Sequence, residues 1–351
     1  MNTTAASVVG GSVAPAADYA PSWVDALIAW IERLPGPAWI AYLAGAGIGA
    51  SLTFVESVPS TTVLVAAAVY YGALPFAVLL LIRLLDRRAG RALRSLRPIL
   101  EMDDGEAVTT AHRLTVVPAR PAIVLLVAAI VLGPLSYVVD PVGSGVAGLT
   151  AGSLALRFVW ESFVSALFLV LIYHTFRQLR LIDAIHRRIV RIDLFDQAPL
   201  YSFSRVTSLT ATGLVVLLVP GVLLIPSDAG QGFLLLSAAW YAAAVAIAAA
   251  AFVLPLRGIH DRIDAEKRDL QAEIGRRITT TLRDIHVAVD AGDGQAVEAR
   301  QRALATLRDE RELVNKVPTW PWSAGALTGF ISAVLLPIGL WIVTRALERL
   351  V

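Results

Sequence analysis

Long apolar runs alternate with arginine-rich connections along most of the chain, a pattern typical of a polytopic membrane protein. A membrane-spanning helix needs about 20 mostly apolar residues. The fold class is therefore expected to be all-α, with helical extensions on the cytoplasmic side. Seven segments meet the length requirement and are the expected membrane helices: Trp39–Val55, Thr61–Leu85, Ala122–Val139, Leu154–Phe176, Val206–Ile225, Phe233–Leu256 and Ser323–Ala346.

The chain begins with a polar segment that is rich in small residues and lacks the apolar core of a signal peptide. We expect residues 1–21 to be a disordered tail. The next segment, Trp23–Leu34, has the period of an amphipathic helix lying at the membrane interface, with one apolar face. That face is expected to carry Trp23, Leu27, Trp30 and Ile31. Residues 22–256 would then hold this helix and the first six membrane helices.

Positive charge is confined to alternate connections between the expected membrane helices. Arginines crowd the second, fourth and sixth connections, whereas Glu56–Ser60, Asp140–Ser153 and Pro226–Gly232 contain no Lys or Arg. The positive-inside rule places the basic connections in the cytoplasm. The amino terminus is therefore expected inside and the carboxyl terminus outside, in an integral protein of the plasma membrane.

The cytoplasmic connections have helical patterns of their own. Residues 154–192 contain no Pro or Gly, so the fourth membrane helix is expected to continue into the cytoplasm. Residues 257–317 carry apolar residues at helical spacing on both sides of the turn sequence Asp290–Gly294. They predict an antiparallel helical hairpin that packs on other cytoplasmic helices or on neighbouring subunits. The elbow and the seventh helix, residues 318–351, follow.

Composition supports the membrane assignment and removes several kinds of chemistry. Hydrophobic residues make up 56% of the chain and charged residues 17%, and there is no cysteine. An ordinary soluble domain is nearer 25% charged. The sequence has no phosphate-binding loop, no zinc-protease motif and no nucleophile elbow. We expect no enzyme activity, no metal, no cofactor and no nucleic-acid partner; the lipid bilayer is the expected surrounding.

Charge inside an expected membrane helix is the first pointer to a functional site. Arg157 and Glu161 lie one turn apart, at the spacing that allows an ion pair, and charges within lipid usually face protein or water. They are either a pair that snorkels to the surface or part of an outer pocket for a small organic ligand. The aromatic residues expected at similar depth complete the candidate pocket: Tyr137, Trp160, Trp240 and Tyr241.

The seventh helix is the second candidate, because small and polar residues recur on one of its faces. Such a face either packs closely on another helix or lines water. The seventh helix follows an elbow with two prolines and two tryptophans, Val317–Trp322. This elbow is either an interfacial belt or a link to the cytoplasmic helices. The candidate pore-lining residues are Ser323, Gly325, Thr328, Gly329, Ser332 and Pro337. In the first membrane helix, Gly45, Gly47 and Gly49 form an expected packing face.

This topology, with seven helices, an inside amino terminus and the longest cytoplasmic element before the last helix, resembles that of the seven-transmembrane ion channels. That superfamily includes the insect odorant and gustatory receptors. The resemblance covers about residues 22–351 and is one of topology, since Ser323–Val351 lacks the Thr-Tyr-x5-Gln-Phe signature of gustatory receptors. It implies an oligomeric ion channel, expected to be a homotetramer and to be ligand-gated if the outer pocket holds a ligand, with the last helix around the pore and the cytoplasmic helices as the anchor between subunits.

Two other functions fit the same sequence. The chain is a membrane sensor or scaffold if its cytoplasmic hairpin docks a soluble partner. A secondary transporter agrees less well with an odd helix count, no visible internal repeat and few charges within the membrane.

Overall fold

The computed structural model describes residues 19–56, 62–132, 149–189, 193–195, 201–224, 231–322, 325, 327–335, 339 and 343. These residues are almost entirely helical, and extended pairing among them is limited to two isolated bridges, Pro21 with Pro118 and Leu100 with Ile189. The helices, in chain order, are α1 (Trp23–Arg33), α2 (Ala38–Glu56), α3 (Thr62–Leu96), η1 (Arg97–Ile99), α4 (Asp104–Thr115), α5 (Ala119–Leu132), α7 (Ala151–His186), α8 (Tyr201–Leu223), α9 (Gln231–Asp290) and α10 (Gly294–Lys316).

The expected count of seven spanning helices stays a prediction. Among the described residues, three helical segments are long and apolar enough to cross a membrane: Val65–Ile99, Ala151–His186 and Tyr201–Leu218. Ala38–Thr53 and Ala119–Val131 are shorter apolar helices. The expected third segment extends into residues 133–148, and half of the seventh lies outside the described residues as well. The chain is an all-helical membrane protein.

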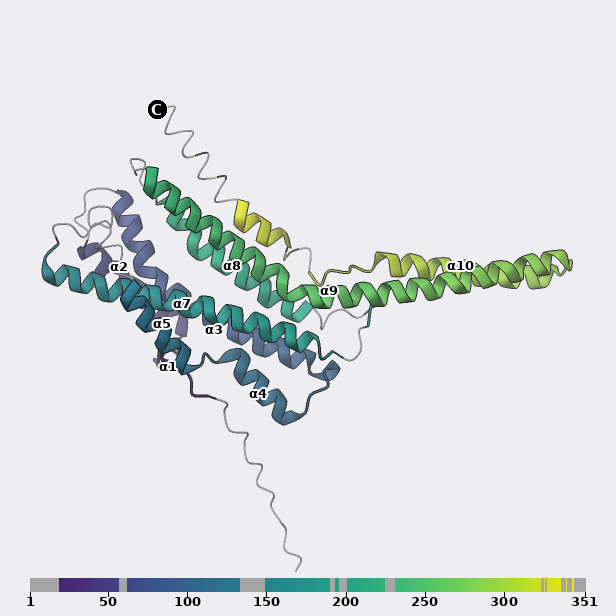
Figure 1. Ribbon diagram of the computed structural model, residues 1–351, viewed down its shortest axis with the longest axis horizontal. Coiled ribbons are helices and arrows are strands. Elements are labelled where there is room, and N and C mark those ends of the chain that lie inside the picture. Colours follow the sequence, from purple (N-terminus) through teal and green to yellow (C-terminus); the bar gives the residue numbers. More distant parts are fainter. Residues whose placement is uncertain are drawn as a thin grey trace, which may run out of the picture.

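The core lies where α3, α7, α8 and α9 pack side by side (Figure 1). Its largest fully buried side chains come from all four helices and from α4. Tyr70 on α3 donates a hydrogen bond of 2.7 Å to the carbonyl of Leu217, which ties α3 to α8. Arg262 on α9 donates to the carbonyls of His186 and Ile189 at 2.9 and 2.6 Å, so it satisfies the end of α7.

Glycines let α2 and α3 approach closely. A Cβ atom on Gly72 would lie 2.2 Å from the backbone nitrogen of Ala50, and one on Gly49 would lie 2.3 Å from the carbonyl oxygen of Gly72. A Cβ on Gly45 would overlap the ring of Phe76, whereas one on Gly47 would meet nothing within 4 Å. The packing face therefore consists of Gly45 and Gly49, without Gly47.

The amino-terminal segment is held against the bundle. Of the expected tail, residues 1–18 lie outside the described residues, whereas the Tyr19 hydroxyl donates to the carbonyl of Val116 at 3.1 Å. Helix α1 buries Val24, Ile28 and Ile31, while Trp30 is 58% exposed. The buried face is thus rotated from the expected one, because α1 packs on protein.

The α7 helix is slightly shorter than expected. It runs to His186, and a turn then takes the chain to the bridge between Ile189 and Leu100. The expected helix through Ile192 is wrong at this end, since Arg187 and Arg188 form a turn. Helix α7 still has 36 residues, which corresponds to about 54 Å at 1.5 Å per residue.

Helices α9 and α10 form a two-helix stalk that projects far from the bundle (Figure 1). Helix α9 has 60 residues, about 90 Å, so it forms both a wall of the bundle and one arm of the stalk. The turn that joins the arms places Gly292 at φ +67°, a conformation that glycine adopts without strain. Among the described helices, α10 packs mainly on α9. The base of the hairpin packs on the end of α7, where Arg262 bonds the carbonyls of His186 and Ile189, so the expected contact with another cytoplasmic helix is present there.

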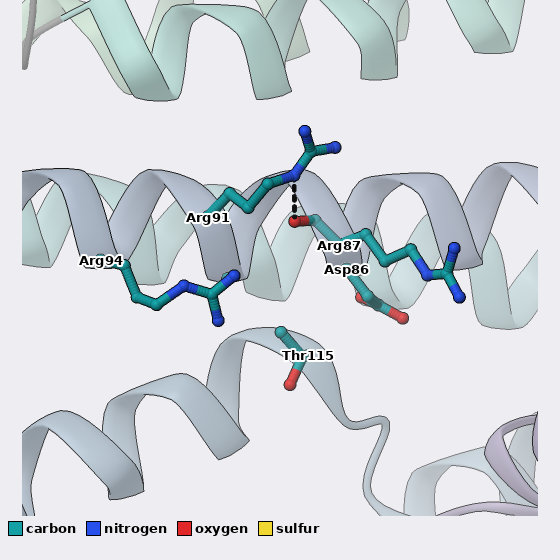
Figure 2. Close-up of a pocket in the computed structure, with 6 residues that line it drawn as sticks. Asp86, Arg87, Arg91, Arg94 and Thr115 are labelled. Atoms are coloured by element: carbon teal, nitrogen blue, oxygen red, sulfur yellow. Dashed lines mark hydrogen bonds between the residues drawn. The ribbon is translucent and has the colours of Figure 1, made fainter.

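Helix α4 lies alongside the last turns of α3 and leaves an open pocket between them (Figure 2). Its volume is about 540 Å³. The lining residues are Asp86, Arg87, Gly90, Arg91, Arg94 and Thr115.

Candidate functional site

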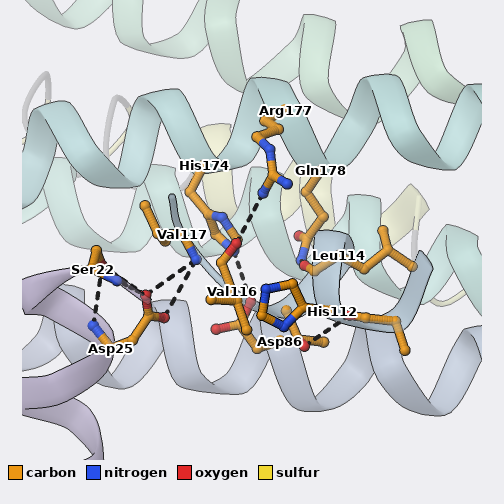
Figure 3. A network of polar contacts seen from close by, with 12 residues as sticks. Ser22, Asp25, Asp86, His112, Leu114, Val116, Val117, His174, Arg177 and Gln178 are labelled. Atoms are coloured by element: carbon orange, nitrogen blue, oxygen red, sulfur yellow. Dashed lines mark hydrogen bonds and ion pairs between the residues drawn. The ribbon is translucent and has the colours of Figure 1, made fainter. Parts of the chain in front are cut away.

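Two regions bring together side chains that are distant in the sequence. The first is a polar junction, made by Ser22, Asp25, Asp86, His174, Arg177 and Gln178 with the backbone of residues 114–117 (Figure 3). The second is an aromatic ladder, made by Phe252, His260, Trp320, Trp322 and Phe330. Each region joins elements that could move relative to one another.

The centre of the polar junction is a pair between α3 and α7. His174 is fully buried, and its Nε2 atom lies 2.7 Å from Oδ1 of Asp86, whose side chain is 15% exposed. The other ring nitrogen of His174 is buried and has no hydrogen-bond partner in the structure. The pair therefore fixes the contact between two long apolar helices at the point where the apolar run of α3 ends.

The next turn of α7 holds the connection between α4 and α5. Arg177 Nη1 donates to the carbonyl of Val116 at 2.9 Å, and Gln178 Nε2 donates to the carbonyl of Leu114 at 2.9 Å. These residues follow His174 by three and four positions, so all three side chains lie on one face of α7. A single face thus binds α3 and the end of α4.

Asp25 extends the junction to the amino terminus. Ser22 caps α1 in a reciprocal arrangement with Asp25, and the backbone N–H of Val117 donates to Asp25 Oδ2 at 3.2 Å. The Asp25 carboxylate therefore serves the helix start and the α4–α5 connection together. Trp23 Nε1 adds a hydrogen bond of 3.2 Å to the carbonyl of Ala122 on α5.

The aromatic ladder joins the stalk, the elbow and the last helix. Trp320 stacks on His260 with ring centroids 4.0 Å apart, and on Trp322 at 4.4 Å. Phe252 of α9 then stacks on Trp322 at 5.0 Å and on Phe330 at 4.8 Å. Such pairs contribute about 0.5–1.5 kcal/mol each beyond area burial. The elbow tryptophans stack within the protein, which favours a link over a simple interfacial belt.

Hydrogen bonds from α9 fix the elbow at the base of the stalk. Lys267 Nζ donates to the carbonyls of Asn315 and Val317 at 2.9 and 2.7 Å, so it satisfies the end of α10. The carbonyl of Thr319 lies 3.1 Å from His260 Nδ1.

On α10, a hydrogen bond from Lys316 and then its charge lower the pKa of the exposed Glu312 carboxyl.

The last helix, described over residues 327–335, touches the bundle along one edge. Phe330, Ala333 and Val334 pack against the core. Of the candidate pore-lining residues, Gly325, Thr328, Gly329 and Ser332 are all exposed. A Cβ on either glycine would meet nothing within 4 Å. Ser323 and Pro337 lie outside the described residues.

The candidate outer pocket is only partly described. Arg157 Nε donates to Glu161 Oε1 at 2.8 Å, and the two side chains are 29% and 36% exposed. The Trp160 ring packs against α2, where a Cβ on Gly49 would lie 2.8 Å from it, and the indole nitrogen is buried without a partner among the described residues. Residue Tyr137 and the side chains of Trp240 and Tyr241 lie outside the described residues, so the pocket of six residues stays a prediction.

The sequence patterns did not reveal the polar junction. Asp86 and His174 are 88 residues apart, and each stands alone among apolar or basic neighbours. The sequence did hold one signal of this pairing, because both residues lie near the end of an apolar run. A carboxylate and an imidazole at those two positions would lie at the same depth in the membrane. Within the described part of the chain, no three His, Asp or Glu side chains group as metal ligands.

Comparisons with known proteins give no relative for this chain. No family model matches the sequence, no curated protein matches it, and no solved structure matches the fold.

Proposed function

We propose that the chain is a subunit of an oligomeric membrane channel, with its last helix beside the water path and its stalk joining the subunits. The observation that carries this proposal is the exposed face of small and polar residues on the last helix. Three lines of geometry support it, and each concerns a different part of the chain.

The first concerns the direction of that face. At about 100° per residue, Gly325, Thr328, Gly329 and Ser332 fall within one 100° sector, whose centre is about 140° from that of the packed edge. Exposed Leu327, Ile331 and Leu335 occupy a third sector. Apolar side chains suit lipid, whereas small and polar ones suit a second helix or water. Among the described residues this small face is exposed, and a ring of copies would bring a second helix or water against it.

The second concerns coupling. The ladder connects His260 on α9, the elbow and Phe330 on the last helix through consecutive stacked rings. A tilt of the stalk base would therefore be transmitted to the last helix by contact between rigid rings. This is the arrangement that a gate moved from outside the membrane would need.

The third concerns the stalk surface. Val287 and Val289, beside the turn, and Leu313, towards the base, are each more than half exposed on the two arms of the stalk. These apolar side chains are spread along an element that projects from the bundle. Copies of the chain that meet along their stalks would cover these side chains and hold the last helices near one axis.

The test is cysteine accessibility along the last helix, because the chain has no native cysteine. Single cysteines from Gly325 to Leu335 are treated with a membrane-impermeant thiol reagent, and ion flux is recorded in reconstituted vesicles. A water path predicts labelling at Gly325, Thr328, Gly329 and Ser332, with block of flux on modification. Cysteines at Phe330 and Ala333 are the matched controls and should stay unlabelled. Protection of all positions together with the absence of flux would refute the channel.

A second candidate is a membrane scaffold, favoured by the length and exposed apolar side chains of the stalk. In that case a soluble partner would cover Val287, Val289 and Leu313 in place of another copy. The oligomeric state in detergent separates the two functions, because the channel needs a ring of subunits and the scaffold does not.

A further inference from the structure

We infer that the pocket between α3 and α4 binds a phosphate group, and that the headgroup of an anionic phospholipid supplies it. Three of the six lining residues are arginines, and they come from one face of one helix. Arg87, Arg91 and Arg94 follow one another at intervals of four and three residues, which is the spacing of neighbours on a helix surface.

The pocket carries positive charge that the chain itself leaves unmatched. Arg87 lies 3.3 Å from Glu32, which also pairs with Arg83. Arg91 uses its Nε to donate to the carbonyl of Arg87 at 3.2 Å (Figure 2). Among the described residues, the terminal guanidinium nitrogens of Arg91 and the whole side chain of Arg94 have no hydrogen-bond or ion-pair partner.

The carboxylates around the pocket already have partners. Asp86 lies at the edge of the pocket and pairs with His174 at 2.7 Å, and Asp104 on α4 pairs with Arg97 at 2.6 Å. Among the described residues, neither carboxylate forms an ion pair with Arg91 or Arg94. An anion from outside the chain would do so, and guanidinium groups match phosphate oxygens through paired N–H donors.

The shape of the pocket suits a compact group. Gly90 forms part of the lining, and a Cβ there would lie 3.6 Å from the methyl carbon of Thr115. Any longer side chain at this position would enter the space between the helices. The volume of about 540 Å³ exceeds that of a phosphate and leaves room for the glycerol attached to it.

The place of the pocket along α3 indicates the source of the phosphate. The mainly apolar stretch of α3 ends at Leu85 and is followed by charged residues, and the pocket lining begins at the next residue, Asp86. An arginine cluster directly beyond an apolar span lies at the depth of lipid headgroups. Lipid phosphate is therefore present where the pocket opens, whereas free phosphate would have to reach it from solution.

The test compares lipid retention by matched variants of the full chain. The protein is placed in nanodiscs of phosphatidylcholine doped with phosphatidic acid, then released for native mass spectrometry, and bound phosphatidic acid is counted. Arg91→Gln with Arg94→Gln removes the free guanidinium groups. Arg88→Gln with Arg180→Gln removes the same charge from exposed arginines near the same membrane edge but outside the pocket. A second variant, Gly90→Leu, fills the pocket and keeps every arginine.

The pocket predicts a loss of retention of about tenfold or more for Arg91→Gln with Arg94→Gln and for Gly90→Leu, and little change for the control pair. A parallel arm titrates inorganic phosphate into the lipid-free protein and records the thermal unfolding midpoint. A rise that depends on Arg91 and Arg94, without phosphatidic acid retention, would assign the phosphate to solution. Equal retention of phosphatidic acid in all variants would refute binding of lipid phosphate in this pocket. So would an equal loss in the two double-arginine variants together with no loss in Gly90→Leu.

Discussion

The pair formed by Asp86 and His174 offers a quantitative test of the polar junction. Removing one partner leaves the other buried without a hydrogen bond, which costs about 1–3 kcal/mol. We therefore expect Asp86→Ala and His174→Phe each to lower the free energy of unfolding by that amount. Replacing both partners removes the unsatisfied group, so the double variant should lie within about 1 kcal/mol of the native chain.

The expected coupling follows from the double-mutant cycle. The sum of the two single losses should exceed the double loss by at least about 1 kcal/mol, as for residues in direct contact. Interhelical hydrogen bonds in membranes average about 0.6 kcal/mol in such cycles, because the unfolded helices find other partners in the membrane. A larger value is expected here because His174 is fully buried and its other ring nitrogen already lacks a partner.

The assay is unfolding in mixed micelles with increasing sodium dodecyl sulfate, followed by circular dichroism and tryptophan fluorescence. Asp183→Ala is the matched control, since this carboxylate pairs only with Arg187 one turn along the same helix and that arginine is 74% exposed. Its loss should be below about 1 kcal/mol. Strictly additive single losses, or a control as costly as Asp86→Ala, would refute the idea that this pair fastens α3 to α7.

Two further predictions concern topology and the stalk. A reporter fused after Gly105 should report the cytoplasm and one fused after Val351 the exterior, and a cytoplasmic carboxyl terminus would contradict seven spans. Leu304→Glu with Leu307→Glu should unfold the stalk or dissociate the oligomer, because Leu304 is only 8% exposed and burial of two leucines contributes about 3–6 kcal/mol. Circular dichroism and light scattering measure this, with exposed Gln301→Glu as the control that should change neither.

Local features of the chain could be read from the sequence with good accuracy. The turn expected at Asp290–Gly294 is where α9 ends, at Asp290, and α10 begins, at Gly294. The amphipathic segment expected over Trp23–Leu34 corresponds to α1, Trp23–Arg33. Helix starts, turns and apolar periods depend on residues within a few positions of one another, so the sequence carries them directly.

The orientation of each helix face was harder to predict. Trp30 was expected on the apolar face of α1 but is 58% exposed, because Val24, Ile28 and Ile31 meet the bundle. Gly47 was expected to pack with its neighbouring glycines, yet its surroundings are open. A membrane helix is apolar on every side, so its pattern does not say which side meets another helix.

The functional junctions depend on which helices become neighbours. The sequence determined that Asp86 and His174 each end an apolar run, and that small residues share one face of the last helix. Only the tertiary structure decided that α3 and α7 place that carboxylate and imidazole 2.7 Å apart, and that the small face turns away from the bundle. The physical reason is that contacts across 88 residues arise from the packing of whole helices, which residue spacing within one helix does not specify.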